Sequence, residues 1–579
     1  MKRNGITLVS LCLLSLCYPA AADILELPTP GDASQADTWA DMLIDWLNAN
    51  VVPNYYSVKT YGAVGDGVTD DTAAIQAAID AAEAAGGGSV YFPVGTYIIS
   101  TEITIDGPGL KLYGHRAILK PADNSLDTII NIDAMDGASP QLTIDGLRFS
   151  GYPVTGSHTG DLIRATDGAF TDTQIQNCWF AMANSNQSAI HGRFFYSSVT
   201  DCIFEFGGSG ILCDENITTY TGSLVVQNCM FYKMAGPAID ITDPGSGNRH
   251  GTVILTGLRI GSQASASGSA IDLEMISNVV MSDITIAWDD IGENPVNCTG
   301  ILVTDVNRVL ANNVQIWDDA GERKSSSDSR FNYGWYIRQD CNDIRIENSQ
   351  VLNARYGLRI SDANAYVTVA DTLFEGGYNA GVLIYSDADG QFTMDNCVIR
   401  RYRQQGLRMD SGNTMESVIR GCRFEDNGYT SAVPVAAING SSRIDILDCT
   451  FDDNGGTSAT AFIDRDATDL FLWNNAFIGS VTTYSTTNGS VNTLNEGLTI
   501  KNGSTSAGYL DIYEDSDNGQ NKVTLAPPSA MDSDYTAVNG TLILDDGANW
   551  RATIVIKAGA VVSVTTAGSS AATATWTPD

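Results

Sequence analysis

Three acidic residues stand in two short segments that share one pattern. Segments 238–241 (AIDI) and 270–274 (AIDLE) both begin with a small residue, followed by apolar, variable and apolar places. Because side chains alternate along a strand, the variable places, Asp240 and Asp272, would face outward. If the segments pair as neighbouring strands, these residues lie one strand spacing apart, ~4.8 Å, and Glu274 lies beside them. Carboxylates this close raise one pKa, which leaves one group a proton donor and the other an ionised base or nucleophile.

This acidic cluster has three interpretations. A proton donor and an ionised carboxylate are the groups that glycoside hydrolysis uses. Carboxylate oxygens are also ligands for Ca²⁺, the one metal cofactor that the sequence leaves open without firmly implying it. The chain contains 68 acidic residues, so both aspartates can equally be ordinary surface acids. The histidines His115, His158 and His250 lack the spacing of a zinc site.

The same outward place recurs in segments spread over the middle of the chain. It is occupied in turn by Arg164, His191, Leu212, Asp240, Asp272, Leu302, Tyr336, Arg359, Leu383, Arg408 and Asn439. The outward place two residues later is occupied by Thr242, Glu274, Thr304, Arg338, Ser361, Tyr385 and Asp410. A solvated face would favour Ser, Thr, Asn and Lys, whereas carboxylates, arginines and tyrosines are what a polysaccharide groove requires. The columns therefore extend the candidate site beyond the acidic cluster.

Basic residues concentrate in the later part of these columns. Residues 323–423 contain 13 Lys and Arg against 12 Asp and Glu, a net of +1 inside a chain of net charge −36. Arginine can hold uronate or sulfate groups through paired hydrogen bonds, and aromatic rings can stack on sugar faces. The predicted substrate-binding residues are Arg164, Arg338, Arg359, Tyr385 and Arg408. The alternative is that these arginines only pair with acids of neighbouring segments.

Two residues of the first column could act as a base. His191 is its one histidine, and Tyr336 stands two residues before Arg338. In a β-elimination, either one could remove the C5 proton of a uronate while an arginine neutralises the uronate carboxylate. A lone surface histidine, however, is more often a bystander than a base. The catalytic candidates are Asp240, Asp272, Glu274, Tyr336 and His191.

A six-residue repeat defines the elements that would hold these residues. Its first and last places are mostly aliphatic or aromatic, its third is usually Asn, Asp or Gly, and its fourth is often Cys. Copies start at residues 144, 175, 199, 226, 255, 281, 311, 346, 369, 394, 419, 446 and 472. Repetition at this period, with β-type alternation, predicts an all-β solenoid of about 13 coils over residues 53–485. Equivalent places in successive coils would stack, so each column would become a row of neighbours.

Cysteine usage agrees with a packed interior. Six of the nine cysteines after residue 22 take the fourth place of the repeat, and they are Cys178, Cys202, Cys229, Cys397, Cys422 and Cys449. Stacked neighbours would have Cβ atoms about a strand spacing apart, wider than the ~3.8 Å that a disulfide needs. We therefore predict free, buried thiols at these places. The state of Cys213, Cys298 and Cys341 stays open.

The start of the chain and its charge narrow the function. Residues 1–22 combine two basic residues, a short apolar run and a small-residue end, which is typical of a secretory signal. Residues 23–52 form a lead-in, with a short helix expected from about 37 to 48. No stretch is long enough for a membrane span. We expect a secreted, extracellular or periplasmic protein, and its net charge of −36 excludes nucleic acid as a default partner.

Residues 61–100 carry a resemblance to a known superfamily. The segment YGAVGDGVTDDTAAIQAAIDAA, followed by GGGSVYFPVGTYIIS, resembles the N-terminal signature of the pectate-lyase-like superfamily of right-handed parallel β-helix proteins. That superfamily includes polysaccharide lyases, pectin-type glycoside hydrolases, mannuronan epimerases and phage tailspike depolymerases. The resemblance implies a right-handed, single-stranded parallel β-helix with an N-terminal capping helix. Here that helix would run from Thr69 or Asp70 to about Ala85, with glycines 86–88 as its stop.

No site of this superfamily transfers whole. The chain lacks the Gly-His-Gly and Arg-Ile-Lys motifs of the pectin hydrolases, and the pairs at 289–290 and 318–319 stand outside that context. Mannuronan epimerases use Asp-Pro-His-Glu, whereas Asp243 and Pro244 are followed here by Gly245. The paired carboxylates favour hydrolysis of an acidic polysaccharide. A polysaccharide lyase and a non-catalytic, tailspike-like glycan-binding adhesin are the alternatives.

The repeat ends near residue 485. Residues 486–579 alternate in short β-like runs, and the stretch 508–536 resembles segments of phage tail proteins. This predicts a small C-terminal β domain that serves attachment or oligomerisation, with a homotrimer as the assembly it hints at.

Overall fold

The computed structural model describes residues 54–133, 141–153, 160–214, 222–242, 249–261, 267–288, 297–318, 331–361, 364–428, 433–439, 443–453, 461–465, 469–479, 482–486, 499–501, 540–545, 550–557 and 560–568. The expected signal, the lead-in helix and the motifs at 243–245 and 289–290 lie outside these residues. Within them, the chain is built almost entirely of strands, with one α-helix, α3 (Thr72–Ala84), and one 3-10 helix, η2 (Val58–Tyr61).

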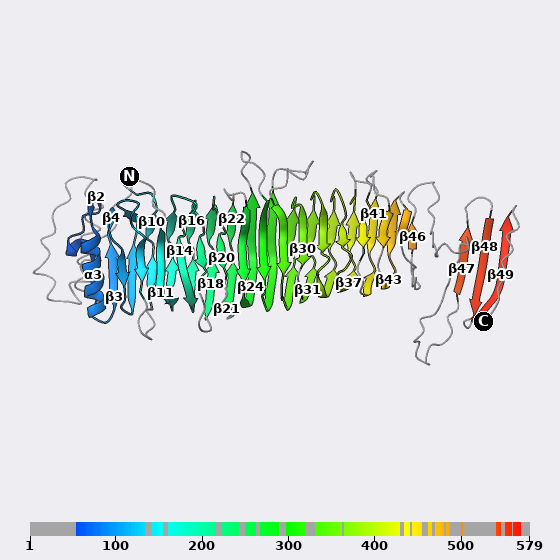
Figure 1. Cartoon of the computed structure of the whole chain (residues 1–579), viewed down its shortest axis with the longest axis horizontal. Helices are drawn as coiled ribbons and strands as arrows, with labels where there is room; N and C mark the ends of the chain where they lie inside the picture. The colour runs from blue at the N-terminus through cyan, green and yellow to red at the C-terminus, as the bar shows by residue number, and fades with distance from the viewer. Residues whose placement is uncertain are drawn as a thin grey trace, which may run out of the picture.

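Two parallel sheets run along the coiled region. In the described residues, the larger sheet contains 31 strands and the second contains 15, and each coil contributes one strand to the second. A representative coil supplies β18 (Ser223–Gln227) and β19 (Met230–Tyr232) to the larger sheet and β20 (Ile239–Ile241) to the second. Figure 1 shows successive coils following one another along the long axis. The predicted all-β parallel solenoid is confirmed.

The repeat copies account for the second sheet. One strand of this sheet follows each copy, from β11 (Asp161–Thr171) to β45 (Thr482–Thr486). Two further strands, β5 (Ile103–Ile105) and β8 (Thr128–Ile132), precede the first copy. Since neighbours in this sheet belong to successive coils, their outward side chains form columns.

The interior is a continuous stack of apolar side chains. Phenylalanines at the last place of the repeat stack face to face, with ring centroids 5.1, 4.9 and 4.5 Å apart along Phe149, Phe180, Phe204 and Phe231. The described cysteines are all free and buried, which confirms the prediction for the six at the fourth place and extends it to Cys213, Cys298 and Cys341. Each stacked thiol donates instead to a backbone carbonyl, as Cys202 Sγ does to Thr200 O at 3.2 Å.

The third place of the repeat owes its composition to backbone geometry. Asn177, Asp201 and Asn228 have φ values of 55°, 54° and 53°, and Gly257 takes the same place at 64°. Only Gly, Asn and Asp adopt this left-handed region readily. The Asn228 amide also donates to Asp201 at 3.3 Å, so the turn is tied to the coil before it.

Helix α3 closes the N-terminal end of the solenoid, as Figure 1 shows. It buries Ile75, Ile79 and Ala82, and Gly86 and Gly87 follow it with φ of 81° and 117°, in agreement with the prediction. The N-cap position is Asp71 rather than the predicted Thr69 or Asp70. The Asp71 carboxylate accepts the N–H groups of the preceding loop, at 2.6 and 3.1 Å. Asp70 Oδ1 accepts the N–H of Thr72 at 3.1 Å, so the predicted side-chain capping by Asp70 is present.

Three further strands form an antiparallel sheet near the C-terminus. They are β47 (Gly540–Asp545), β48 (Trp550–Lys557) and β49 (Ala560–Gly568). Across the residues that the structure describes, no helix is both long and apolar enough to cross a membrane.

Candidate active site

The outer face of the second sheet carries the predicted columns. Its strands are in register, so that Arg164 lies beside His191, His191 beside Leu212, Leu212 beside Asp240, and Asp240 beside Asp272. The same register continues through Leu302, Tyr336, Arg359, Leu383 and Arg408. The predicted last member, Asn439, was wrong. Arg408 lies beside Ala437, because alanine fills both the first apolar place and the variable place of β39 (Ala436–Ile438), and the small residue at 437 resembles the start of the pattern.

Asp240 and Asp272 lie side by side on β20 and β23 (Ser267–Glu274), and both are partly buried. Burial, followed by the charge of Asp272, raises the pKa of Asp240 to about 7. Burial also raises the pKa of Asp272 to about 6, although Arg338 opposes that change. Oδ1 of Asp240 is buried without a hydrogen-bond partner among the described residues, which suits a site that receives a ligand oxygen. At neutral pH Asp272 is therefore mainly ionised, whereas Asp240 keeps its proton in a large fraction of the molecules.

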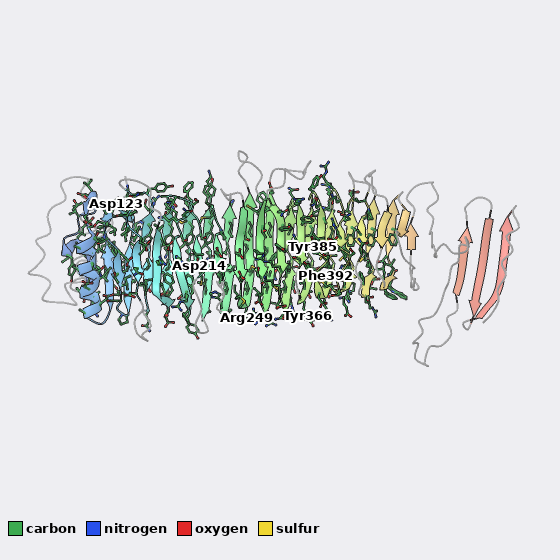
Figure 2. All side chains as sticks on the ribbon, viewed as in Figure 1. Asp123, Asp214, Arg249, Tyr366, Tyr385 and Phe392 are labelled. Carbon is green, nitrogen blue, oxygen red and sulfur yellow. The ribbon has the colours of Figure 1, made fainter. Side chains whose placement is uncertain are left out.

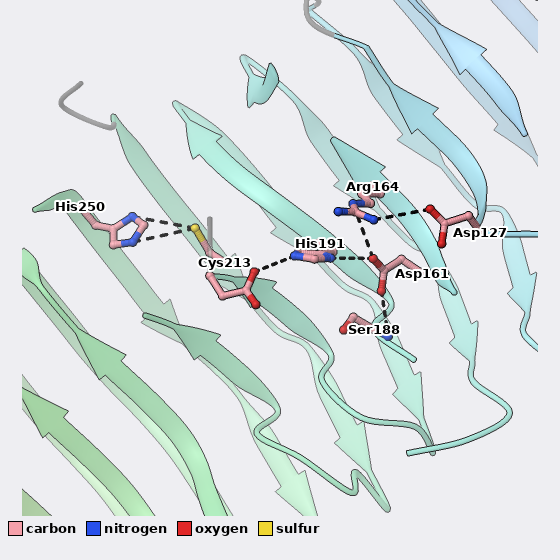
Figure 3. A network of polar contacts seen from close by, with 8 residues as sticks. Asp127, Asp161, Arg164, Ser188, His191, Cys213 and His250 are labelled. Atoms are coloured by element: carbon pink, nitrogen blue, oxygen red, sulfur yellow. Dashed lines mark hydrogen bonds and ion pairs between the residues drawn. The ribbon is translucent and has the colours of Figure 1, made fainter. Parts of the chain in front are cut away.

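His191, on β14 (Ile190–Phe195), is held between two carboxylates. Its Nδ1 lies 2.6 Å from Asp161 Oδ2 and its Nε2 lies 2.8 Å from Asp214 Oδ1, and Figure 3 shows both contacts. Burial lowers the pKa of His191, but the two hydrogen bonds outweigh it and raise the pKa to about 9. Two carboxylate acceptors require both ring nitrogens to donate, so His191 is an imidazolium at neutral pH. In this arrangement it is not a proton acceptor.

Arg164 belongs to the same network rather than standing free. Its guanidinium lies 3.6 Å from Asp127 and 4.0 Å from Asp161, as Figure 3 shows. Asp161 also accepts the backbone N–H of Ser188 at 3.2 Å. Arg164 therefore pairs with neighbouring acids, as the alternative interpretation of the arginines expected.

Three acids of this network were missed by the sequence reasoning, Asp127, Asp161 and Asp214. Asp214 stands two residues after Leu212 and continues the second column one coil before Thr242, so extending that column backward would have found it. Asp161 stands three residues before Arg164, outside both columns, and only its contacts reveal it.

Beyond Leu302 the face changes character and becomes arginine-rich and aromatic. On β30 (Tyr356–Ser361), the guanidinium of Arg359 lies 5.2, 4.8 and 4.6 Å from the ring centroids of Tyr333, Tyr336 and Tyr385. It also donates to the Tyr333 hydroxyl at 2.5 Å. Tyr385 is 38% exposed, and Figure 2 labels it further along the molecule than Asp214. The rings hold this cation without neutralising it.

The other two predicted arginines of this region differ from each other. Arg338, at the end of β27 (Phe331–Arg338), donates to Thr304 Oγ1 at 2.9 Å and lies 6.0 Å from the Tyr336 ring. Arg408, on β36 (Leu407–Met409), donates to Asp410 at 2.7 Å and is therefore neutralised. Arg338 and Arg359 are the better candidates for binding an anion.

The described residues contain no cluster of three or more His, Cys, Asp or Glu side chains arranged to hold a metal ion. These residues therefore provide no ligand set for Ca²⁺, the metal that the sequence left open.

Comparison with known proteins agrees with this architecture. A family model described as rhamnogalacturonase A/epimerase, pectate lyase-like, matches residues 55–247, and a model of the right-handed β-helix region matches residues 217–391. The chain carries a pectate-lyase-like right-handed β-helix. The resemblance inferred from residues 61–100 is thereby confirmed.

Curated relatives match parts of this β-helix chain. It is similar to mannuronan C5-epimerase AlgE1 of Azotobacter vinelandii, with 73% identity over 45 residues, 8% of this chain and 3% of that protein. Mannuronan C5-epimerase AlgE4 of the same organism is 42% identical over 126 residues, 22% of each chain. Plasmin and fibronectin-binding protein A of Streptococcus pneumoniae is 36% identical over 174 residues, 28% of this chain and 23% of that protein. The chain thus spans less than a quarter of each relative's length.

Proposed function

We propose that this protein is an exported enzyme that hydrolyses glycosidic bonds in an acidic polysaccharide. One observation carries the proposal: two neighbouring outward carboxyls, Asp240 and Asp272, have pKa values raised to about 7 and about 6. Asp240 is the proton donor to the leaving oxygen, and Asp272 is the ionised base or nucleophile.

The surrounding charges support this division of roles. The positive charge of Arg338 lowers the pKa of Asp272, whereas the negative charges of Asp272 and Asp214 raise the pKa of Asp240. These charges therefore favour the protonated form of Asp240 and the ionised form of Asp272. His191 serves this arrangement by orienting Asp214 through a 2.8 Å contact, rather than by accepting a proton.

An acidic substrate is supported by two independent observations. Arg338 and Arg359 lie on the same face as the carboxyl pair, further along the coils. Among the partial relatives, several are named mannuronan C5-epimerases and one is named alginate lyase, and mannuronan and alginate are uronate polymers. Export, a C-terminal β domain over 486–579 and assembly as a homotrimer complete the proposal.

The decisive experiment records new reducing ends and ultraviolet absorbance together while the mature protein acts on uronate-containing and sulfated glycans. Hydrolysis gives reducing ends without new absorbance, and Asp240→Asn and Asp272→Asn each abolish them. New absorbance that persists in both variants would overturn the assignment to hydrolysis.

A lyase is the second candidate, because Tyr336 lies between two arginines. The Arg338 and Arg359 guanidinium groups lie 6.0 and 4.8 Å from its ring centroid, and its hydroxyl accepts from Ser361 Oγ at 3.1 Å. This geometry suits proton removal from a uronate whose carboxylate an arginine neutralises. Absorbance that rises with the reducing ends, and is lost in Tyr336→Phe, supports this candidate.

An adhesin is the third candidate, and it draws on the partial similarity to the plasmin and fibronectin-binding protein. A non-catalytic protein would bind glycan through the same outer face, without turnover of any glycan by the wild type. Retained binding in Asp240→Asn together with absent wild-type turnover supports this candidate.

A further inference from the structure

Charge is distributed unevenly along the outer face of the second sheet. Three successive strands, β17 (Ile211–Cys213), β20 and β23, contain no Lys or Arg. They present Asp240, Asp272 and Glu274, and Asp214 follows directly after β17. We call these four residues the carboxylate half of the face. Arg338 and Arg359, with the rings of Tyr333, Tyr336 and Tyr385, form its arginine half.

The two arginines of this half have no carboxylate partner among the residues that the structure describes. Arg338 donates to the Thr304 hydroxyl and Arg359 to the Tyr333 hydroxyl, at 2.9 and 2.5 Å. Arg408 and Arg400, by contrast, pair with Asp410 and Glu375, both at 2.7 Å. In a chain of net charge −36, two unneutralised cations on one face are best explained by an anionic ligand.

The carboxylate half has the opposite preference. An anionic sugar over Asp214 and Asp272 would place like charges within a few ångströms, which is unfavourable. An uncharged sugar meets no such repulsion, and its hydroxyl groups can donate to the same carboxylates. An uncharged unit therefore fits over this half better than an anionic one.

The spacing lets one glycan contact both halves. Two coils separate Asp272 from Tyr336 through Leu302, so their Cα atoms lie roughly 10 Å apart at the usual strand spacing. Arg338 reaches back from its own coil to Thr304, in the coil between. An anionic group bound by Arg338 thus lies close to the sugar that meets the catalytic pair.

We propose that the two halves take chemically different sugars, so that the substrate is a heteroglycan. An uncharged unit lies over Asp214 and Asp240, a uronate or sulfated unit lies over Arg338 and Arg359, and the bond that is cut joins units of the two kinds. This inference rests on the proposed hydrolysis and adds to it the order of charged and uncharged units.

Binding tests the inference without turnover. The probes are polygalacturonate (uronates only), dextran (uncharged) and hyaluronan and desulfated chondroitin, in which a uronate alternates with an uncharged N-acetylated sugar. In the Asp240→Asn variant, which should stop turnover but keeps the carboxylates of Asp214, Asp272 and Glu274, an alternating glycan should bind at least about tenfold more tightly than either homopolymer, as expected for one added charge-assisted contact. Tighter binding of polygalacturonate would overturn the inference.

Matched arginine variants show which half is responsible. Added to the Asp240→Asn variant, Arg338→Gln and Arg359→Gln should each weaken binding of the alternating glycan about 10- to 100-fold and leave dextran binding unchanged. Arg420→Gln is the control, since Arg420 lies on the larger sheet, is 56% exposed and pairs with Asp395. Equal losses in all three variants would mean that net charge, not the arginine half, attracts the glycan.

Product ends separate failure of this inference from failure of the proposed function. Mass spectrometry of wild-type products should show a charged unit at one new end and an uncharged unit at the other. A cut between two uronates would refute the heteroglycan and leave hydrolysis standing. Absence of any cut or bound probe would refute the proposed function, and the inference would fall with it.

Discussion

The carboxylate half and the arginine half are built by different strands of the same sheet, yet they handle charge in opposite ways. In the carboxylate half, charges meet each other: Asp214 pairs with the neighbouring His191, and burial raises the pKa values of Asp240 and Asp272. In the arginine half, Arg359 meets three tyrosine rings instead. The first half adjusts protonation states, and the second keeps a positive charge available.

The two partly buried cations, His191 and Arg359, show the same contrast. The His191 imidazolium is neutralised by Asp161 and Asp214. The rings around Arg359 attract a cation but carry no net charge, so its guanidinium can still bind an external anion. A cation that carboxylates neutralise stabilises the fold. A cation that only aromatic rings surround keeps its charge and can bind an anionic ligand.

The largest expected effect is on the catalytic pair. Asp240→Asn and Asp272→Asn should each lower kcat about 10²- to 10⁴-fold, because each removes one partner of the acid–base pair. Glycan affinity should change little, since the arginine half is intact. The control is Asp445→Asn, which removes an ion-paired aspartate of the larger sheet. Rates within threefold of wild type would place the chemistry elsewhere.

Removal of the imidazolium should lower stability. His191→Gln removes the cation that pairs with both Asp161 and Asp214, at an expected cost of about 1 to 3 kcal/mol in the free energy of unfolding. The folded pKa of about 9 lies above the usual value, so this stability is fully present below about pH 6.5 and is lost as pH rises through 9. Urea unfolding at pH 6 and pH 9.5 should therefore separate wild type from variant at the lower pH only. An equal difference at both would contradict the imidazolium.

Arg338 connects the two halves, and its loss should move the pH profile. The activity of wild type should be bell-shaped, with limbs near pH 6 and 7 that report Asp272 and Asp240. In Arg338→Gln, the acid limb should move upward, because the positive charge that lowers the pKa of Asp272 is gone. The KM for an anionic glycan should rise about tenfold. An unmoved acid limb would mean that the two halves act independently.

The smallest effect is expected at Tyr385. This ring lies 4.6 Å from Arg359 and is 38% exposed, so Tyr385→Ala should remove one stacking surface and weaken glycan binding about two- to fivefold. Tyr366→Ala, which removes a more exposed ring on the larger sheet, is the control. A loss above about 50-fold would make Tyr385, rather than the arginines, the main contact of this half.

The sequence predicted the fold well because the repeat contains its physical causes. Apolar first and last places fill the interior, and Asn, Asp or Gly at the third place supplies the left-handed turn seen at Asn177 and Gly257. The same periodicity placed Asp240 beside Asp272 and Tyr336 beside Arg359. Positions that depend only on the pattern within one coil could therefore be predicted from the sequence.

Contacts that join different coils could not be read in this way. The protonation of His191 depends on Asp161 and Asp214, which lie 30 and 23 residues away in sequence. The N-cap position was predicted one residue too early because Asp70 and Asp71 are both aspartates. The last column position at Ala437 was missed because two alanines stand side by side there. Such details are decided by packing between coils, which a repeat pattern does not record.

The strict register of the second sheet has a consequence for how such a molecule changes over generations. Spacing between a reacting group and a binding group grows or shrinks only in whole coils, ~4.8 Å at a time. Loss of the stretch from Leu302 to Trp335 would join two equivalent strand positions and bring Arg338 one coil nearer to Asp272, with the inward-facing pattern intact. Duplication of that stretch would do the reverse. The distance between the two halves is thus set in whole coils, and it can be altered without redesign of either half.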